Sequence, residues 1–173
     1  MRVDTPWLTP QQLAAWVRLT AVLELLPAAL DSQLRQDAEL THFDYYVLAM
    51  LSEAPEHTLR MTALAERTTA TLARLSHVVQ RLESRGLLKR FPCPDDRRAT
   101  NARLTETGWQ KVRDSAPGHL ATVRANVIDA LTPEQIVQLG AISDAILHRL
   151  DPDRAKAALY ERYDPLQPRH PQA

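Results

Sequence analysis

The chain contains 173 residues, which at about 150 residues per domain corresponds to one domain with a short extension. Its content of 45% hydrophobic and 24% charged residues is typical of a globular protein and excludes a collagen-like, disordered or disulfide-scaffold chain. The single cysteine, Cys93, can form neither an internal disulfide nor a Cys-x-x-Cys metal site. The apolar stretch 19–30 contains Glu24 and Pro27 and has no basic start. We therefore expect neither a membrane span nor a signal peptide, and a cytoplasmic protein.

The net charge of zero conceals an uneven distribution of charge along the chain. Residues 60–103 include ten Lys or Arg and four Asp or Glu, a net charge of +6, which leaves −6 on the rest of the chain. Locally concentrated positive charge is the electrostatic footprint of proteins that bind polyanions. A basic surface that merely faces solvent is the alternative interpretation.

Two helices are expected to begin with the same signal. Thr9 and Thr132 are each followed by Pro and, three positions after the Thr, by Gln, as in a capping box with proline at the first helical position. Apolar residues then recur at helical spacing over 13–34 and 136–150, so each segment predicts a helix with a wide apolar face. Pro27 is expected to kink or interrupt the first of them.

Short helices and a hairpin are expected between these two segments. The helices are one that begins at Thr41 and ends before Pro55, one over 62–68 and one over 72–85. Gly86 follows the third helix, as is usual after a helix C-terminus. Residues 87–91 and 100–104 then predict a β-hairpin around a polar turn at 92–98.

A long helix is expected after Thr105. Trp109, Val112 and Leu120 belong to an apolar series with spacings of 3 and 4, which suits packing against another helix. Pro117 should bend this helix.

The helix over 72–85 has two different faces. One face carries Leu72, Leu75, Val78, Val79 and Leu82, and the opposite face carries Ala73, Ser76, His77, Gln80 and Ser84. Short polar side chains can read base edges in a major groove, while Arg74 and Arg81 at the border can reach phosphates. A helix that only covers a core is the alternative.

The order of helix, short helix, turn, helix and charged hairpin is that of a winged helix-turn-helix. With this order the chain resembles the MarR (multiple antibiotic resistance regulator) family of bacterial transcription factors over residues 9–150. The resemblance is carried by Leu64-Ala65-Glu66-Arg67, by Val79 to Arg90, and by Asp96-Arg97-Arg98 followed by Leu104-Thr105-Glu106-Thr107-Gly108. The last group matches the family's wing pattern, which is Asp-x-Arg, five residues, then Leu-Thr.

The resemblance implies a mainly α-helical fold with a small β-hairpin wing. It divides the chain into an N-terminal dimerisation region (1–40), a winged helix-turn-helix DNA-binding lobe (41–104), C-terminal dimerisation helices (105–150) and a short helical or flexible tail (151–173). It also implies a homodimeric, nucleoid-associated regulator, expected to be a repressor. Such a protein would bind a pseudo-palindromic operator in double-stranded DNA and leave it when a small aromatic or phenolic ligand binds.

The resemblance places helix 72–85 in the major groove and Arg98 in the neighbouring minor groove, where a narrow groove attracts arginine. Asp96 is expected to hold the Arg98 side chain by a charged hydrogen bond. The expected DNA-binding residues are Thr71, Ala73, Arg74, Ser76, His77, Gln80, Arg81, Arg97 and Arg98. Many members have Thr-Arg where this chain has Ser76-His77, so an operator sequence cannot be carried over.

In relatives, small aromatic compounds often bind between the dimer helices and the DNA-binding lobe. By this location and by their aromatic character, the candidate ligand-binding residues are Trp16, His42, Tyr45 and Tyr46. Packing in the core is the alternative role of these side chains. Oxidant sensing by Cys93 is a further alternative, although the sensing cysteines of relatives lie near the N-terminal helix.

Catalysis and cofactor binding are not expected. The six histidines include no i, i+3 or i, i+4 pair, so the sequence predicts no metal site. No Gly-x-Ser-x-Gly motif or Gly-rich phosphate loop is present, and we expect neither an enzyme nor a cofactor. The competing function is that of a winged helix used for protein–protein contact, against which the arginines of the basic segment argue.

Overall fold

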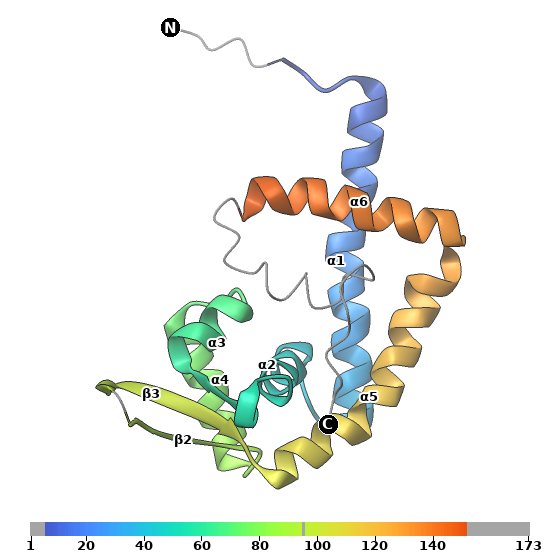
Figure 1. Cartoon of the computed structure of the whole chain (residues 1–173). Coiled ribbons are helices and arrows are strands. Elements are labelled where there is room, and N and C mark those ends of the chain that lie inside the picture. Colours follow the sequence, from blue (N-terminus) through green and yellow to red (C-terminus); the bar gives the residue numbers. More distant parts are fainter. Residues whose placement is uncertain (1–5, 95, 152–173) are drawn as a thin grey trace, which may run out of the picture.

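The computed structural model describes residues 6–94 and 96–151, apart from the side chain of Arg97 (Figure 1). Its elements are α1 (Pro10–Ala38), α2 (His42–Ser52), η1 (Pro55–His57), β1 (Thr58–Arg60), α3 (Met61–Arg67), α4 (Leu72–Ser84), β2 (Leu88–Cys93), β3 (Asp96–Leu104), α5 (Glu106–Asn126), η2 (Ile128–Ala130) and α6 (Pro133–Leu150). This mainly helical fold with a small sheet confirms the expected fold class. Beyond Asp151, the expected tail lies outside the described residues.

Threonine caps most of the long helices. Thr9, Thr41 and Thr132 each form a complete capping box with the residue three positions later. The hydroxyls of Thr71 and Thr105 accept from the backbone N–H groups at the same spacing. Because the first turn of a helix leaves backbone N–H groups without partners, these caps define where each helix begins.

The prolines inside α1 and α5 do not break either helix. α1 runs through Pro27, so of the two expected effects, a kink or an interruption, the interruption was wrong. A proline removes one intrahelical hydrogen bond and leaves the turns on either side intact. α5 also continues through Pro117, and it curves along its length (Figure 1).

The three strands form an antiparallel sheet in the order β1-β3-β2. The sequence did not predict β1, which is only three residues long and is defined by its pairing with β3. The expected turn at 92–98 is also shorter than predicted, because β2 continues to Cys93 and β3 begins at Asp96. β2 is an edge strand with an irregularity between Pro92 and Cys93, the setting in which a strand accommodates proline.

The hydrophobic core lies in the lobe formed by α2, α3, α4 and the sheet. Its fully buried side chains include Leu48, Leu51, Leu64, Leu75, Val79 and Leu82. The core cluster begins at Ala38 and ends at Val112 on α5. Residues 41–104, which we call the winged-helix lobe, therefore contain most of the core.

The first turn of α5 docks on the turn between α4 and β2. Gly86 in that turn has a φ of 71°, a conformation that glycine adopts without strain. Thr105 donates its N–H to the Leu87 carbonyl (3.1 Å) and its hydroxyl to the Gly86 carbonyl (2.7 Å). A Cβ on Gly108 would lie 1.9 Å from the Leu87 carbonyl oxygen, so this close approach requires glycine. α5 is thereby fixed to the base of the wing.

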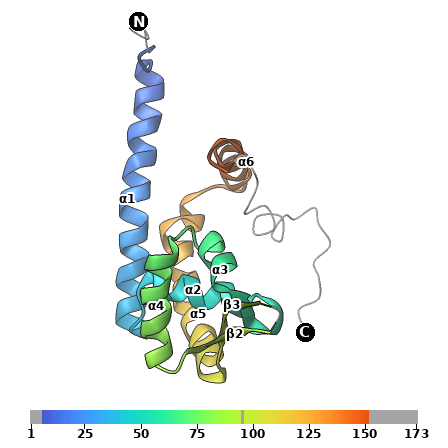
Figure 2. The same cartoon turned by 90° about the vertical axis from the view of Figure 1, so that its left-hand side faces the viewer.

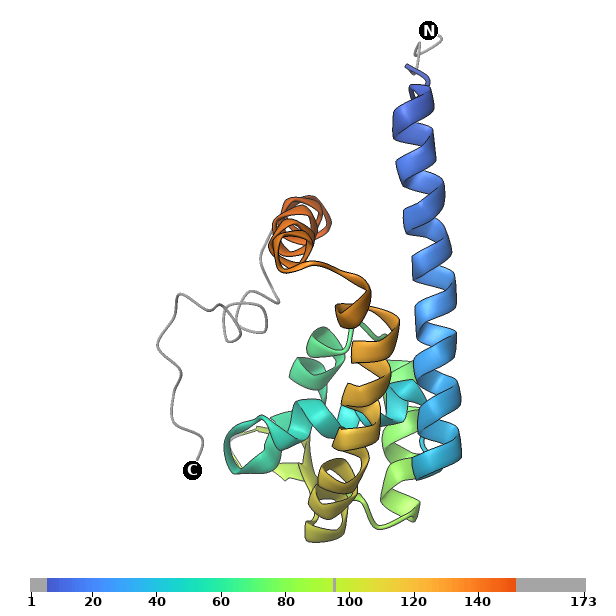
Figure 3. The same cartoon turned by 90° about the vertical axis from the view of Figure 1, so that its right-hand side faces the viewer.

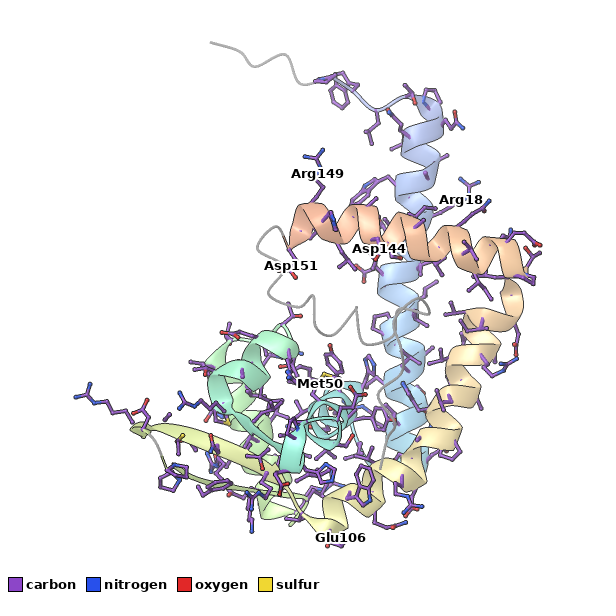
Figure 4. All side chains as sticks on the ribbon, viewed as in Figure 1. Arg18, Met50, Glu106, Asp144, Arg149 and Asp151 are labelled. Atoms are coloured by element: carbon purple, nitrogen blue, oxygen red, sulfur yellow. The ribbon has the colours of Figure 1, made fainter. Side chains whose placement is uncertain are left out.

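The N-terminal part of α1 and the whole of α6 lie outside the core. The first buried residue of α1 is Leu30, and α6, which is described in full, has none. Exposed apolar side chains on these helices include Leu13, Trp16, Val17, Val22, Leu23, Ile136, Leu139, Ile142 and Ile146, which together we call the outer apolar surface. Figures 2 and 3 show the two segments standing clear of the lobe and apart from each other. In Figure 4, Met50 lies inside the lobe, whereas Arg18 and Arg149 project from these helices.

By length and composition alone, α1 is apolar enough to cross a membrane. An 18-residue window within its 29 residues has a mean hydropathy of 1.6 and is 6% buried. The expectation that no N-terminal segment is long and apolar enough for a membrane span is therefore not supported. That expectation considered residues 19–30, and the helix extends well beyond them. A helix that packs against a second subunit has the same composition, so this test alone does not identify a membrane protein.

Candidate nucleic-acid interface

α4 presents the polar face that the sequence predicts. Ser76, His77 and Gln80 are exposed, while Leu75, Val78, Val79 and Leu82 are buried. Leu72 differs from the prediction, with 51% of its surface exposed, because it is the first helical residue after the Thr71 cap and precedes the turn that packs on the core. The hydroxyl of Thr71 accepts from the Arg74 N–H at 3.2 Å.

The arginines of α4 and its C-cap residue Arg85 lie against α2 and the end of α1. The guanidinium of Arg74 lies 4.2 Å from the centre of the Phe43 ring, in a cation–π contact. Arg81 forms an ion pair with Asp44. Arg85 donates from Nη1 to the Glu39 carbonyl at 2.9 Å. These contacts are not visible in the sequence pattern, from which Arg81 was predicted only to reach DNA phosphate.

The tip of the wing carries Arg98. Its side chain is exposed, and its backbone N–H donates to Asp96 Oδ1 at 3.0 Å. The Asp96 carboxylate was expected to accept from the Arg98 guanidinium, but it accepts from the Arg98 backbone N–H instead. In a tight turn, the side-chain carboxylate of one residue lies close to the N–H of the residue two positions later. The side chain of Arg97 lies outside the described part of the structure. In Figure 1 the hairpin projects away from α5.

An ion pair fixes the wing to the end of α4. Glu83 Oε1 accepts from the backbone N–H of Arg90, and Glu83 Oε2 accepts from the Arg90 Nε, both at 2.8 Å. These backbone and side-chain hydrogen bonds hold the pKa of the Glu83 carboxyl below its usual value. α4 and the hairpin therefore form one unit, and Figure 2 places both at the end of the molecule away from the N-terminal half of α1.

The four candidate ligand-binding residues do not come together within one chain. The rings of Tyr45 and His42 contact His119 of α5, with centroid distances of 4.6 and 6.0 Å. Tyr46 instead donates its hydroxyl to the Arg67 carbonyl, at 3.1 Å.

Trp16 is remote from this group within its own chain. It lies 15 residues before Asp31 on α1, which is about 22 Å along a helix. Asp31 Oδ1 accepts the N–H of His42 at 2.8 Å and so marks where α1 meets α2. The grouping of Trp16 with His42 therefore fails for a single chain.

The cluster of His42, Tyr45 and His119 joins α2 to α5 and also faces α1. Burial lowers the pKa of His42, and the Asp31 carboxylate partly opposes this shift. Burial, followed by repulsion from His42, lowers the pKa of His119. Within the described part of the chain, His119 Nδ1 and Gln33 Oε1 are buried without hydrogen-bond partners.

These two histidines should make the protein less stable in mild acid. Their pKa values are lowered on folding, so the unfolded chain binds more protons once the pH falls below the unfolded value of about 6.5. We expect the free energy of unfolding to fall between pH 7.5 and 5.5, and to fall less in His119→Gln. Urea unfolding at both pH values measures this difference. The control is His148→Gln, at an exposed position of α6. Equal pH dependence in the two variants would contradict the assignment.

In residues 6–94 and 96–151, no group of three or more His, Cys, Asp or Glu side chains is placed to hold a metal ion. Cys93 is buried, and Arg60 Nη2 lies 3.4 Å from its sulfur.

A family model described as the MarR family matches residues 40–100. Among solved structures, the MarR family transcriptional regulator Sco3205 from Streptomyces coelicolor, in complex with DNA, is 41% identical with a TM-score of 0.83; the match covers 87% of this chain and 94% of that one. AbsC, a MarR family transcriptional regulator from Streptomyces coelicolor, is 39% identical with a TM-score of 0.80; the match covers 84% of this chain and 98% of that one.

A curated relative is the HTH-type transcriptional repressor YetL of Bacillus subtilis (strain 168), which is 28% identical over 86 residues. That match covers 50% of this chain and 52% of YetL, so it spans about half the length of the relative. The match to Sco3205 extends over nearly all of both chains. The chain therefore belongs to the MarR family, whose members are DNA-binding transcriptional regulators and not enzymes.

Proposed function

We propose that two copies of this chain form a dimer that represses transcription by binding an inverted repeat in double-stranded DNA. The observation that carries this proposal is the pairing of an exposed polar α4 face with an Arg98-bearing wing, held together by the Glu83–Arg90 ion pair. A helix and a hairpin in this arrangement suit adjacent major and minor grooves. The winged-helix lobe, residues 41–104, is then the DNA-binding unit.

In this proposal the outer face of α4 enters the major groove. Ser76, His77 and Gln80 lie over base edges, and Ala73 can contact a thymine methyl group. Thr71 and Arg74 lie at the N-terminal end of α4, where backbone N–H groups and positive charge favour phosphate. Arg98 would enter the minor groove, and Arg97, its neighbour in the sequence, would meet phosphate.

The dimer is supported by the outer apolar surface. An exposed apolar area of this extent on a folded monomer marks an interaction site. Both segments that carry it, residues 1–40 and 105–150, flank the lobe, so two copies joined there would hold two α4 helices at a fixed separation. Trp16 belongs to this surface, and we assign it to the dimer interface.

A selection from random-sequence duplex DNA tests the proposal. The protein should retain duplexes that share an inverted repeat, with half-site centres about 10 base pairs, or 34–36 Å, apart. In a reporter assay the selected site should lower transcription. If no sequence is enriched at moderate salt, the lobe serves protein–protein contact instead.

We also propose that a small aromatic acid or phenol releases the DNA by binding beside His42 and Tyr45, where α2, α5 and α1 meet. The support is the cluster itself: the Tyr45 ring packs against the His119 ring, whose Nδ1 is buried without a hydrogen-bond partner among the described residues. Gln33 of α1, whose Oε1 is also unpartnered there, lies beside Gly118, the residue before His119. A pocket of apolar walls with a few polar groups is the usual form of a ligand site. Tyr46, whose hydroxyl bonds to the Arg67 carbonyl at the end of α3, is not included in this site.

A screen of aromatic carboxylic acids and phenols tests this second part. An effective compound should raise the melting temperature of the free protein and weaken its binding to the selected duplex. Tyr45→Ala should abolish both effects, while Trp16→Ala should retain the effect on melting temperature. The effector proposal fails if the whole series changes neither quantity.

A further inference from the structure

Arg74 and Arg81 of α4, together with the C-cap residue Arg85, form one stripe along the helix. Arg74, Arg81 and Arg85 are separated by seven and four residues, which places them on the same side of a helix. Their partners are the Phe43 ring, the Asp44 carboxylate and the Glu39 carbonyl. All three partners lie in residues 39–44, which we call the α1–α2 joint.

Asp44 is the centre of this contact. It is 2% exposed, whereas the Arg81 side chain is 51% exposed. Its Oδ2 accepts the Thr41 N–H at 3.0 Å as part of the α2 cap. A buried carboxylate that loses its cation is strongly unfavourable, so the Arg81 guanidinium is held on Asp44 even though part of it reaches solvent.

The joint also connects α4 to α1. Glu39, at the end of α1, has a φ of 54° and directs its carbonyl to Arg85. Asp31, in the penultimate turn of α1, accepts the N–H of His42. Figure 2 shows α4 running beside the lower end of α1. The orientation of α4 relative to the dimer helices is therefore set by contacts within this joint.

We propose that Arg81 is a positioning residue that acts on DNA binding through Asp44 and not through a DNA phosphate. The pair sets the angle at which α4 enters the major groove, and a small error in this angle is doubled across a dimer. This inference rests on the proposed function, because it requires a DNA site.

Asp44→Asn separates the two roles of Arg81 by the sign of its effect. The substitution removes an acid near the DNA surface and frees Arg81, so binding should tighten if Arg81 contacts phosphate. If Arg81 positions α4, binding should weaken, by about tenfold for a coupled pair of this kind. The asparagine can still accept the Thr41 N–H, so the α2 cap is retained.

The measurements use the duplex selected by the unaltered protein, at two salt concentrations. We expect Arg81→Met to weaken binding with an unchanged salt slope, and Arg81→Lys to restore part of the affinity. The double variant Asp44→Asn/Arg81→Met should bind about as weakly as either single variant, because both remove the same contact. The double variant leaves no buried charge without a partner. It can therefore be measured in place of either single variant if that variant does not fold.

Arg124→Ala is the matched control, because it removes an arginine from an exposed ion pair with Asp129, at the far end of α5. It should leave the affinity unchanged. For each variant, the melting temperature and the fraction of protein able to bind DNA are measured, so that a loss of folding is distinguished from a loss of affinity. Tighter or unchanged binding by Asp44→Asn overturns the inference, as does a salt slope reduced by about one per subunit in Arg81→Met. If the unaltered protein selects no duplex, the proposed function itself fails.

Discussion

Ile142→Glu is expected to dissociate the dimer and to weaken DNA binding by about 100-fold or more. Ile142 lies on α6 with 57% of its surface exposed in the single chain, so the substitution should leave the fold of the lobe intact. In a dimer, two unpaired carboxylates would enter an apolar interface, and each buried unpaired charge is unfavourable by about 3–5 kcal/mol. A monomer then holds one half-site at a time and loses the gain from the linked second half-site.

Light scattering and DNA binding on the same samples measure this effect. The unaltered protein should have about twice the 19.5 kDa chain mass, and Ile142→Glu should have the mass of one chain. Ala141→Glu is the control, because Ala141 is also exposed but points away from the side shared by Leu139, Ile142 and Ile146. A dimeric Ile142→Glu with full DNA affinity would remove α6 from the proposed interface.

The helices could be predicted from the sequence because their signals are local. A capping box joins residues three positions apart, so its pattern is visible in the chain itself. α1 and α6 begin at Pro10 and Pro133, as the Thr-Pro-x-Gln signals predict. The exposure of Ser76 and His77 could also be predicted, because the buried positions of α4 repeat with the helical period.

Contacts between distant parts of the chain could not be predicted in this way. Asp44 and Arg81 are 37 residues apart, and a polar helix face has the same sequence pattern whether it meets DNA or another helix. The three residues of β1 become a strand only through their pairing with β3. Expected location and aromatic character both group Trp16 with His42, although the length of α1 keeps the two apart within one chain.

Arg98→Ala and His77→Ala are expected to weaken DNA binding in different ways. His77 is exposed in the middle of the outer face of α4, so its loss should relax the preference at one or two base positions. A good base contact contributes about 1–3 kcal/mol of discrimination. Arg98, at the tip of the wing, should respond mainly to the width and charge of a minor groove. Its loss should weaken binding to all sequences and reduce the salt slope by about one per subunit.

Binding of a library of single-base operator variants at two salt concentrations distinguishes these outcomes. Arg98→Lys is the informative comparison, because it retains the charge and loses the planar guanidinium. It should restore the salt slope but only part of the affinity, since a narrow A·T-rich groove accommodates a flat, weakly hydrated guanidinium better than a strongly hydrated ammonium. His77→Ala should retain the full salt slope, because a side chain that contacts a base edge and not a phosphate releases no counterion from the phosphates. If Arg98→Ala binds as tightly as the unaltered protein with the same salt slope, the wing does not touch DNA, and α4 alone must supply the contacts.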